Sequence, residues 1–594
     1  MLPIPRSIFT ACLSLGFFLF SRPLFTQETV FRINQAGYLP DDSKVGLVMS
    51  KVALKKKVSV YDQNHQLRLT AKLQPTLGSK WGSFPYQYTL DLSPIQEEGT
   101  YQLSLQDQTW SLFVQQDAFH DYEEVLLSFM RQQRCGYNPY FGVVCHRKDG
   151  KLFYAPVEDS TYYDFSGGWH DAGDQLKYLI TSSNATARML ITYLEYEEKF
   201  DDKVDDLGHP YPNGRADILD EAKWGLEWLL KIHPKPDWLI HQIADDRDHR
   251  GFKYPDQDNA DYGWGSNSYR VAYFADGKPQ GLGKWKSAST GLANLAGRTA
   301  AALALGARVF QTGPDSVFAL RCRKAAISLY ELGKKHPGFQ QGNSYGAPYR
   351  YNEDSWEDDM EFAAAELYKL NGNSAYLEDA IHYANLIQDQ GWMAQDSMWH
   401  YQKYPFMNMG HYSLYEVAPE AVRIQLAAWY RSNIENVIRR AETNAFHVGI
   451  PFIWCSNNLL VNFITQVILY EKMTGDLQFH RNMLLHRDWL MGRNPWGTSM
   501  FTLLPDKGEY PLDVHLPSRY LMKKTPAGGL IDGPIYRSIH DNLIGLKLNE
   551  ADEFEAFQND FIVYHDDLGD YSTNEPTMDG TADAIFIMAH WSHP

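Results

Sequence analysis

The sequence lacks an excess of positive charge. Its 55 Lys and Arg residues are outnumbered by 73 Asp and Glu residues, which gives a formal net charge of −18. Proteins that bind nucleic acid need a basic surface to neutralise phosphates, so this balance argues against a nucleic-acid partner. A neutral polymer or a small sugar remains compatible with it.

Long hydrophobic runs are absent beyond the first 27 residues. A transmembrane helix needs about 20 consecutive apolar residues, so no membrane span is expected after that point. Residues 1–27 combine Arg6 with an apolar stretch over residues 8–20, which is the pattern of a secretory signal peptide. We therefore expect an exported, soluble protein, periplasmic or extracellular. Lipidation of Cys12 is the less favoured alternative, because Cys12 lies too early in the apolar stretch.

Cysteine is scarce, and two of the remaining four lie close to histidines. Cys135 and Cys145 precede or adjoin His146, and His170 follows later in the chain. Two thiolates and two imidazoles are a typical tetrahedral zinc set, and four protein ligands would make the ion structural. A Cys135–Cys145 disulfide, which an exported protein could form, would leave both histidines unexplained. Free thiols are the third alternative.

Aromatic residues are plentiful, at 14% of the chain with 16 Trp and 37 Tyr. This excess suits a protein that stacks flat ligand faces such as sugar rings. A large aromatic core accounts for part of it.

Two kinds of periodicity divide the chain, whose 594 residues exceed the usual limit of a single core. Residues 28–116 contain short alternating runs, such as 57–61 and 101–105, that predict a small β-sandwich. Residues 117–594 have helical spacing, which predicts a toroid of helix hairpins whose loops build a cleft on one face. No low-complexity linker separates the parts, so direct packing is expected. Predicted helices cover residues 216–231, 291–310, 324–335, 357–370 and 419–430, with an apolar stripe over 459–468.

The most informative segment, residues 167–174, reads Gly-Gly-Trp-His-Asp-Ala-Gly-Asp. Asp171 and Asp174 lie three residues apart among small residues, which let a backbone approach a bulky ligand. Two acids on one turn can hold a water molecule. Activation of water by a carboxylate base, with a distant carboxylic acid, is the chemistry of an inverting glycosidase. A plain turn or a cation-binding loop is the alternative.

Four motifs in order give the chain a resemblance to glycoside hydrolase family 9, the inverting cellulases, in the branch with an N-terminal immunoglobulin-like domain. The segment 31–40, Phe-Arg-Ile-Asn-Gln-Ala-Gly-Tyr-Leu-Pro, resembles the opening strand of that domain. Residues 167–174 resemble the family's base motif, and 492–497, Gly-Arg-Asn-Pro-Trp-Gly, resemble its cleft-floor segment. Residues 570–575, Asp-Tyr-Ser-Thr-Asn-Glu, resemble its acid motif.

The resemblance implies an (α/α)6 barrel and a role for each carboxyl group. Asp174 would be the base, Asp171 a second carboxylate that positions the water, and Glu575 the general acid. Glu575 must stay protonated near neutral pH, so we expect burial or nearby negative charge to raise its pKa. In zinc-bearing members of the family a similar set of cysteines and histidines holds a structural ion beside the base motif.

Substrate-binding candidates also follow from the resemblance. Trp356 looks like a sugar-stacking residue at a helix start, His249 like a cleft histidine, and His515 like the first histidine of a His-His-Arg segment. Here His515 is followed by Leu and Pro, so the Arg is missing in register and Arg519 is the nearest substitute. Calcium is common in the family. The acidic loop 201–206 could bind it, although a solvated charge run is the preferred interpretation.

The expected function is therefore inverting hydrolysis of β-1,4-glucan, with endoglucanase action favoured. The alternative within the family is an exo-acting β-glucosidase or β-glucosaminidase, since the altered His515 segment suggests changed subsites. A non-catalytic carbohydrate-binding protein is the distant alternative, because it would be expected to lose a catalytic carboxylate, and Asp171, Asp174 and Glu575 are all present.

Overall fold

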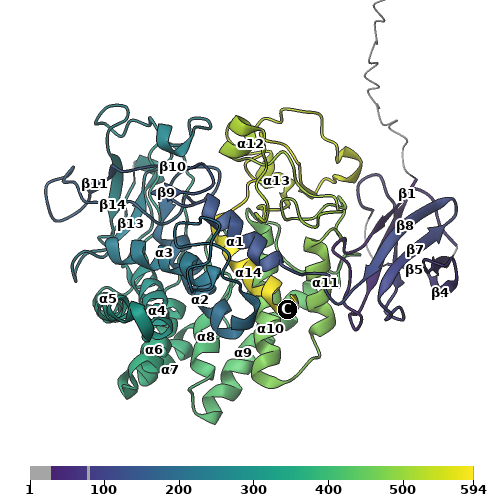
Figure 1. Ribbon diagram of the computed structural model, residues 1–594, viewed down its shortest axis with the longest axis horizontal. Helices are drawn as coiled ribbons and strands as arrows, with labels where there is room; N and C mark the ends of the chain where they lie inside the picture. Colours follow the sequence, from purple (N-terminus) through teal and green to yellow (C-terminus); the bar gives the residue numbers. More distant parts are fainter. Residues whose placement is uncertain (1–27, 56, 77–79, 282, 593–594) are drawn as a thin grey trace, which may run out of the picture.

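A computed structural model describes residues 28–592 except 56, 77–79 and 282. The predicted signal peptide, residues 1–27, lies outside the described residues. Figure 1 shows a small β-domain beside a larger helical domain. No helix in the described part of the chain is long and apolar enough to cross a membrane.

Two four-stranded antiparallel sheets form the β-domain, as the alternating pattern predicts. Their strand orders are β1-β2-β6-β5 and β4-β3-β7-β8. In β3, buried Val58 and Val60 alternate with more exposed neighbours because successive side chains point to opposite faces of a strand. The strands are β1 (Thr29–Arg32), β2 (Val45–Ser50), β3 (Lys57–Tyr61), β4 (Leu67–Lys72), β5 (Gln74–Pro75), β6 (Tyr86–Asp91), β7 (Gly99–Leu105) and β8 (Gln108–Val114).

Among the described residues, six helices form an inner ring and six more lie outside it. The inner helices are α2 (Leu179–Glu195), α4 (Ala293–Val309), α6 (Glu357–Asn371), α8 (Met409–Tyr415), α10 (Ser456–Thr474) and α14 (Met578–Trp591). The outer helices are α1 (Tyr122–Gln132), α3 (Asp217–Lys231), α5 (Ser316–Lys335), α7 (Ser374–Ile387), α9 (Glu420–Ala441) and α11 (His480–Leu490). Each inner helix contacts the next, and α14 contacts α2, so the ring closes. This confirms the (α/α)6 barrel.

The structure has a helix at each predicted position, but two of these helices are longer than predicted. Helices α3, α4 and α6 begin and end within two residues of the predicted bounds. Helix α5 begins eight residues before residue 324, and α9 continues eleven residues beyond 430. Both lie in the outer layer, where many residues are exposed, so polar side chains weaken the apolar pattern at their ends.

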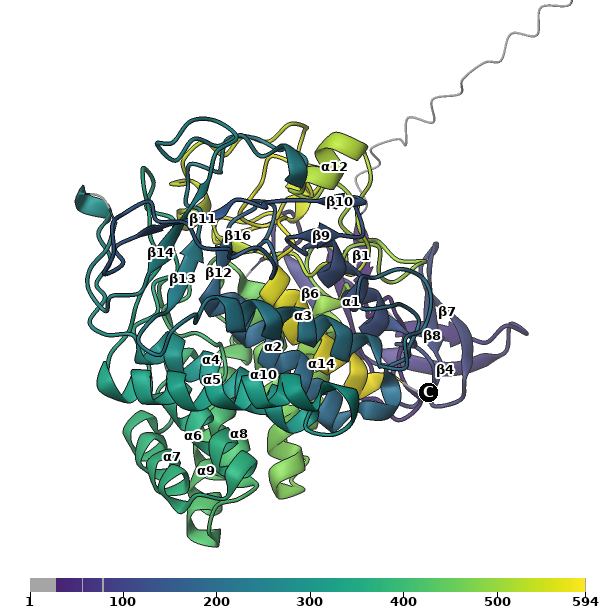
Figure 2. The same ribbon diagram turned by 60° about the vertical axis from the view of Figure 1, so that its left-hand side comes forward.

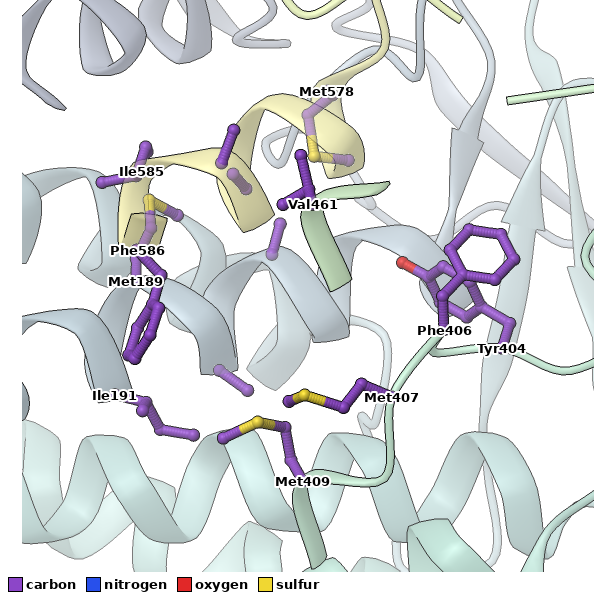
Figure 3. Packing of buried hydrophobic residues seen from close by; sticks show 14 of the residues in the cluster. Met189, Ile191, Tyr404, Phe406, Met407, Met409, Val461, Met578, Ile585 and Phe586 are labelled. Atoms are coloured by element: carbon purple, nitrogen blue, oxygen red, sulfur yellow. The ribbon is translucent and has the colours of Figure 1, made fainter. Parts of the chain in front are cut away.

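The inner helices are buried on nearly every side. In α10 all residues from Ser456 to Tyr470 are buried, although the sequence predicts only one apolar stripe. Its polar residues find partners inside the barrel; the amide of Asn462, for example, donates to Asp583 Oδ2 at 2.8 Å. Figure 3 shows Met189, Met409 and Phe586 of three inner helices meeting in the core. Flexible methionine side chains suit such irregular gaps.

Long connections gather at one end of the barrel in both Figure 1 and Figure 2. Their short strands are missing from the sequence prediction because two to five residues are too few to establish a period. They comprise the sheet β11-β14-β13-β12 (Asp149–Phe153, Arg270–Phe274, Ile240–Ile243, Lys177–Tyr178) and the pairs β9–β10 (Tyr137–Asn138, Val143–Val144) and β15–β16 (Ile535–Tyr536, Ile562–Val563). Helices α12 (Pro517–Met522) and α13 (Arg537–His540) lie in the same region.

The β-domain packs directly on the barrel, as expected from the missing linker. Asn34 Nδ2 donates to Asp488 Oδ1 at 2.9 Å, and Gln35 Nε2 donates to the Gly497 carbonyl at 2.7 Å. Arg493 is buried and donates to the Val45 carbonyl at 2.7 Å. Residues 492–497 therefore join the two domains, and none of them lines the cavity at the loop end of the barrel. The prediction that they form a cleft floor is wrong.

Candidate active site

A cavity of about 710 Å³ opens among the loops at one end of the barrel. Its lining brings together the acidic turn around Asp171 and Asp174, the histidines His249 and His515, and Glu575. These residues come from segments up to about 400 positions apart in the sequence. The fold thus places five of the sequence-predicted site residues around one space.

Asp171 and Asp174 occupy different surroundings within the same turn. Asp171 is only 4% exposed, and it accepts hydrogen bonds from Thr181 Oγ1 at 2.7 Å and from the Tyr351 hydroxyl. Burial and the negative charge of Asp174 raise the pKa of Asp171 well above its ordinary value. Asp174 is more open to the cavity, with 20% of its side chain exposed. Both residues line the cavity, and Asp174 has the more exposed carboxyl group of the two.

Two groups hold Asp174. The Leu176 amide donates to Oδ1 at 2.9 Å, and His249 Nε2 lies 3.2 Å from Oδ2. Burial opposes a charge on His249, but the hydrogen bond and charge of Asp174 outweigh it and raise the pKa of His249 to about 8. His249 is thereby oriented toward Asp174 and holds its carboxyl group in place.

Glu575 reaches the acidic turn from a segment 402 positions from Gly173 in sequence. Its Oε1 accepts a hydrogen bond from the Gly173 amide at 2.9 Å, between Asp171 and Asp174 in sequence. Burial, followed by the charges of Asp532 and Asp174, raises the pKa of Glu575 well above its ordinary value. A carboxylic acid that keeps its proton near neutral pH can act as a proton donor.

Asp532 is a site residue that the sequence reasoning missed. It is buried in the lining of the cavity, where Trp454 Nε1 donates to Oδ2 at 2.9 Å and Cys455 Sγ donates to Oδ1 at 3.0 Å. Its amide donates to the Glu575 carbonyl at 2.9 Å. The only signal in the sequence is an acid flanked by glycines, Gly-Leu-Ile-Asp-Gly at residues 529–533. The residues that make Asp532 part of the site come from distant segments, which the sequence alone does not bring together.

The other substrate-binding candidates divide into two groups. His515 lines the cavity and is oriented by Nδ1, which lies 2.6 Å from the Leu568 carbonyl. Trp356 and Arg519 are not among the residues that line it. Trp356 packs edge-on against Tyr383, and Arg519 donates to Asp513 Oδ1 at 2.7 Å. The structure thus does not bring either side chain to the position that the sequence predicts.

The cysteine–histidine set converges beside the acidic turn. Cys135 Sγ lies 3.7 Å from His146 Nδ1, Cys145 Sγ lies 3.8 Å from His170 Nε2, and the two imidazole nitrogens are 3.1 Å apart. Ligands of a tetrahedral ion with Zn–N about 2.0–2.1 Å and Zn–S about 2.3 Å lie roughly 3.3–3.8 Å from one another. The donor set therefore fits a zinc ion. Both cysteines are free thiols here, not a disulfide.

This cluster is tied to the acidic turn through the backbone. His170 directly precedes Asp171, and its amide donates to the Gln133 carbonyl at 2.7 Å. The Cys135 amide donates to the Gly168 carbonyl at 2.8 Å. An ion held by the cluster would stiffen the segment that carries Asp171 and Asp174.

The loop predicted as a possible calcium site has its carboxylates engaged elsewhere. Asp202 accepts from the Asn213 and Gly214 amides at 2.9 and 2.7 Å. Asp205 accepts from the His209 amide at 2.8 Å. Within the described residues, the acids of this loop do not converge on a common point.

Comparison with known proteins assigns both domains to known families. The model of glycosyl hydrolase family 9 matches residues 119–588, and that of the cellulase N-terminal ig-like domain matches residues 26–109. Endoglucanase D of Acetivibrio thermocellus is 23% identical over 502 residues, covering 80% of this chain and 73% of that protein. Cellulose 1,4-beta-cellobiosidase of the same species is 25% identical over 631 residues, covering 94% and 67%.

Solved structures agree on the fold. A metagenome-derived glycoside hydrolase family 9 endoglucanase matches with a TM-score of 0.74 and 22% identity, covering 95% of this chain and 99% of that one. The fold and the carboxyl-lined cavity define a glycoside hydrolase. The family model spans most of the chain, and the protein belongs to glycosyl hydrolase family 9.

Proposed function

We propose that the protein hydrolyses internal β-1,4 linkages of a cellulose-like glucan with inversion at the anomeric carbon. The observation that carries this proposal is the hydrogen bond from the Gly173 amide to Glu575, a carboxyl group whose pKa is raised by burial, beside the turn of Asp171 and Asp174 in one cavity. Relatives named endoglucanases support internal cleavage.

In this proposal the two sides of the cavity divide the chemistry. Glu575 protonates the glycosidic oxygen as the bond breaks, and its raised pKa supplies the proton near neutral pH. Asp174 takes a proton from the attacking water, while Asp171 helps to position that water. Inversion requires the carboxyl groups of Asp174 and Glu575 to lie roughly 6.5–9.5 Å apart, with the water between base and sugar.

Two histidines complete the proposed substrate site. His249 holds Asp174 through the contact between them and is 35% exposed, so its ring can also contact a sugar hydroxyl. His515 also lines the cavity and packs against Phe252, with 4.6 Å between the ring centroids. Trp356 and Arg519 form no part of this proposal because both lie outside the cavity lining.

We further propose a structural zinc ion held by Cys135, Cys145, His146 and His170. The burial of the cluster and its ligand separations support this assignment. All four positions of a tetrahedral ion would be filled by protein, so the ion would stabilise the base turn and take no part in the reaction.

The domain limits remain our own proposal: residues 28–116 for the immunoglobulin-like domain and 117–594 for the catalytic barrel. The proposed boundary at 116/117 lies between the two matched family segments, which end at residue 109 and begin at residue 119. The signal-like pattern of residues 1–27 supports export to the periplasm or the cell exterior.

The function is tested by assaying reducing ends released from a soluble cellulose derivative and product released from aryl glycosides. An endo-acting β-glucanase releases reducing ends from the polymer and lowers its viscosity early in the reaction. Activity confined to monosaccharide aryl glycosides would instead establish the exo-acting alternative, a β-glucosidase or β-glucosaminidase.

A further inference from the structure

Two tyrosines from different segments that line the cavity meet at their hydroxyl groups. Tyr349 lies in the segment 347–352, and Tyr571 lies four residues before Glu575. Their hydroxyl oxygens are 3.2 Å apart. Because this is hydrogen-bond distance, no sugar ring can pass between the two side chains while the contact holds.

A third residue completes a closed ring of hydrogen bonds. The Ile544 amide donates to the Tyr349 hydroxyl at 3.2 Å, and the Tyr571 hydroxyl donates to the Ile544 carbonyl at 2.8 Å. With these two bonds made, the Tyr349 hydroxyl can donate its proton to the hydroxyl oxygen of Tyr571. Each member of the ring then donates once and accepts once, an arrangement in which hydrogen bonds strengthen one another.

The segment that carries Ile544 is fixed a few residues further on by Asp567, which lies in the loop that leads to Glu575. Asp567 accepts from the amides of Asn549 and Glu550, each at 2.9 Å. The side chain of Ile544 is 64% exposed, so packing of that side chain does little to fix the tip. The hydroxyl group of Tyr349 therefore joins this tip to the segment 347–352, while Tyr571 holds the tip on the side of Glu575.

The ring of hydrogen bonds lies against an aromatic side chain that also lines the cavity. The Trp454 ring is 5.6 Å from that of Tyr349 and 5.6 Å from that of Tyr571, measured between centroids. Trp454 donates to Asp532, whose amide contacts Glu575. The tyrosine contact therefore stands close to the reacting groups, where it limits the space for a polymer.

We propose that Tyr349, Tyr571 and Ile544 form a tie that closes one end of the substrate cleft and sets the balance between internal and terminal cleavage. An internal segment of a glucan has chain on both sides of the scissile bond, so it enters only when the tie opens. A chain end needs no such opening. This inference rests on the proposed function and adds a determinant of where along the polymer the enzyme cuts.

The tie is tested with Tyr349→Phe, Tyr571→Phe and the double variant on soluble carboxymethyl cellulose. Each phenylalanine keeps the ring but removes two of the three bonds. The measured quantity is viscosity loss per reducing end formed, which rises with internal cleavage. We expect it to increase about fivefold or more, because the loss of two ordinary hydrogen bonds shifts an opening equilibrium by roughly 5- to 150-fold. Tyr193→Phe, whose hydroxyl bonds Glu197 on the protein surface, is the matched control and should leave the ratio unchanged.

The outcomes separate the two proposals. An unchanged ratio in all three variants, with melting temperatures near that of the unmodified protein, would overturn the tie and leave the proposed function standing. If the unmodified protein released no reducing ends from any β-glucan, the proposed function and the tie would both be rejected. Longer early products in the double variant than in the unmodified protein would support the tie independently.

Discussion

The amide of Gly173 donates a hydrogen bond to Oε1 of Glu575 at 2.9 Å, across 402 positions of sequence. This contact joins the turn that carries Asp171 and Asp174 to the segment that carries the proposed acid. A side chain at position 173 would have no room, since a Cβ built there lies 2.2 Å from the His515 carbonyl oxygen and 2.6 Å from Glu575 Oε1. Glycine at this position therefore sets the approach of acid and base.

Replacing Gly173 with alanine should displace the acid from the base turn. The nearest atom is a backbone oxygen, which cannot move aside as a flexible side chain could. Misplacement of a reacting group by about 1 Å can lower the rate about 10²-fold, and we expect a fall in kcat/KM of that order on a soluble glucan. Gly391→Ala is the control, because a Cβ there meets no atom within 4 Å. Equal activity of Gly173→Ala and Gly391→Ala would refute the packing argument.

Removing one thiol from the cysteine–histidine cluster should abolish metal binding and loosen the base turn. We expect one zinc per chain in protein purified without chelator, and none in Cys135→Ser, together with a lower melting temperature. Cys322→Ser also replaces a buried free cysteine but lies in helix α5, so it should retain the zinc. Elemental analysis decides the matter. A Cys135–Cys145 disulfide in the purified protein would be incompatible with the proposal.

Asp532 should control the alkaline limit of activity through Glu575. Burial and then the charge of ionised Asp532 raise the pKa of Glu575, and burial also raises the pKa of Asp532 itself, so both groups titrate on the alkaline side of their ordinary values. Asp532→Asn removes that charge at every pH and so lowers the pKa of Glu575. Glu575 then loses its catalytic proton at a lower pH. In Asp532→Asn the alkaline limb of the kcat/KM profile should move to lower pH, whereas Asp237→Asn, on an exposed surface residue, should leave it in place. An alkaline limb that stays fixed in Asp532→Asn would show that this charge does not set the proton donor.

The sequence predicts the parts of the fold that follow a local period. Strand β3 alternates in sequence and in burial, and helix α4 falls within two residues of its predicted bounds. The start of α5 and the end of α9 differ from the prediction. Both helices are in the exposed outer layer, where polar residues interrupt the apolar period that would mark a helix end.

Contacts between distant segments account for most of what the sequence could not reveal. Asp532 is unremarkable in sequence, and only the fold sets it against Trp454 and Glu575. Residues 492–497 were assigned to the cleft, but their buried Arg493 faces the β-domain. The segment 167–174 is informative because its glycines, His170 and its two carboxylates are close to one another in sequence as well as in space.

The central claim, that Glu575 supplies the proton and Asp174 activates the water, is tested most directly by substrates with different leaving groups. Glu575→Gln should lower turnover of a cello-oligosaccharide by about 10²–10⁴-fold, the usual contribution of general acid catalysis. The same variant should lose far less activity on a glycosyl fluoride, which needs little protonation. Asp174→Asn should slow both substrates together, because both need an activated water. If Glu575→Gln slowed both substrates equally, or neither, the assignment of Glu575 as the acid would be contradicted.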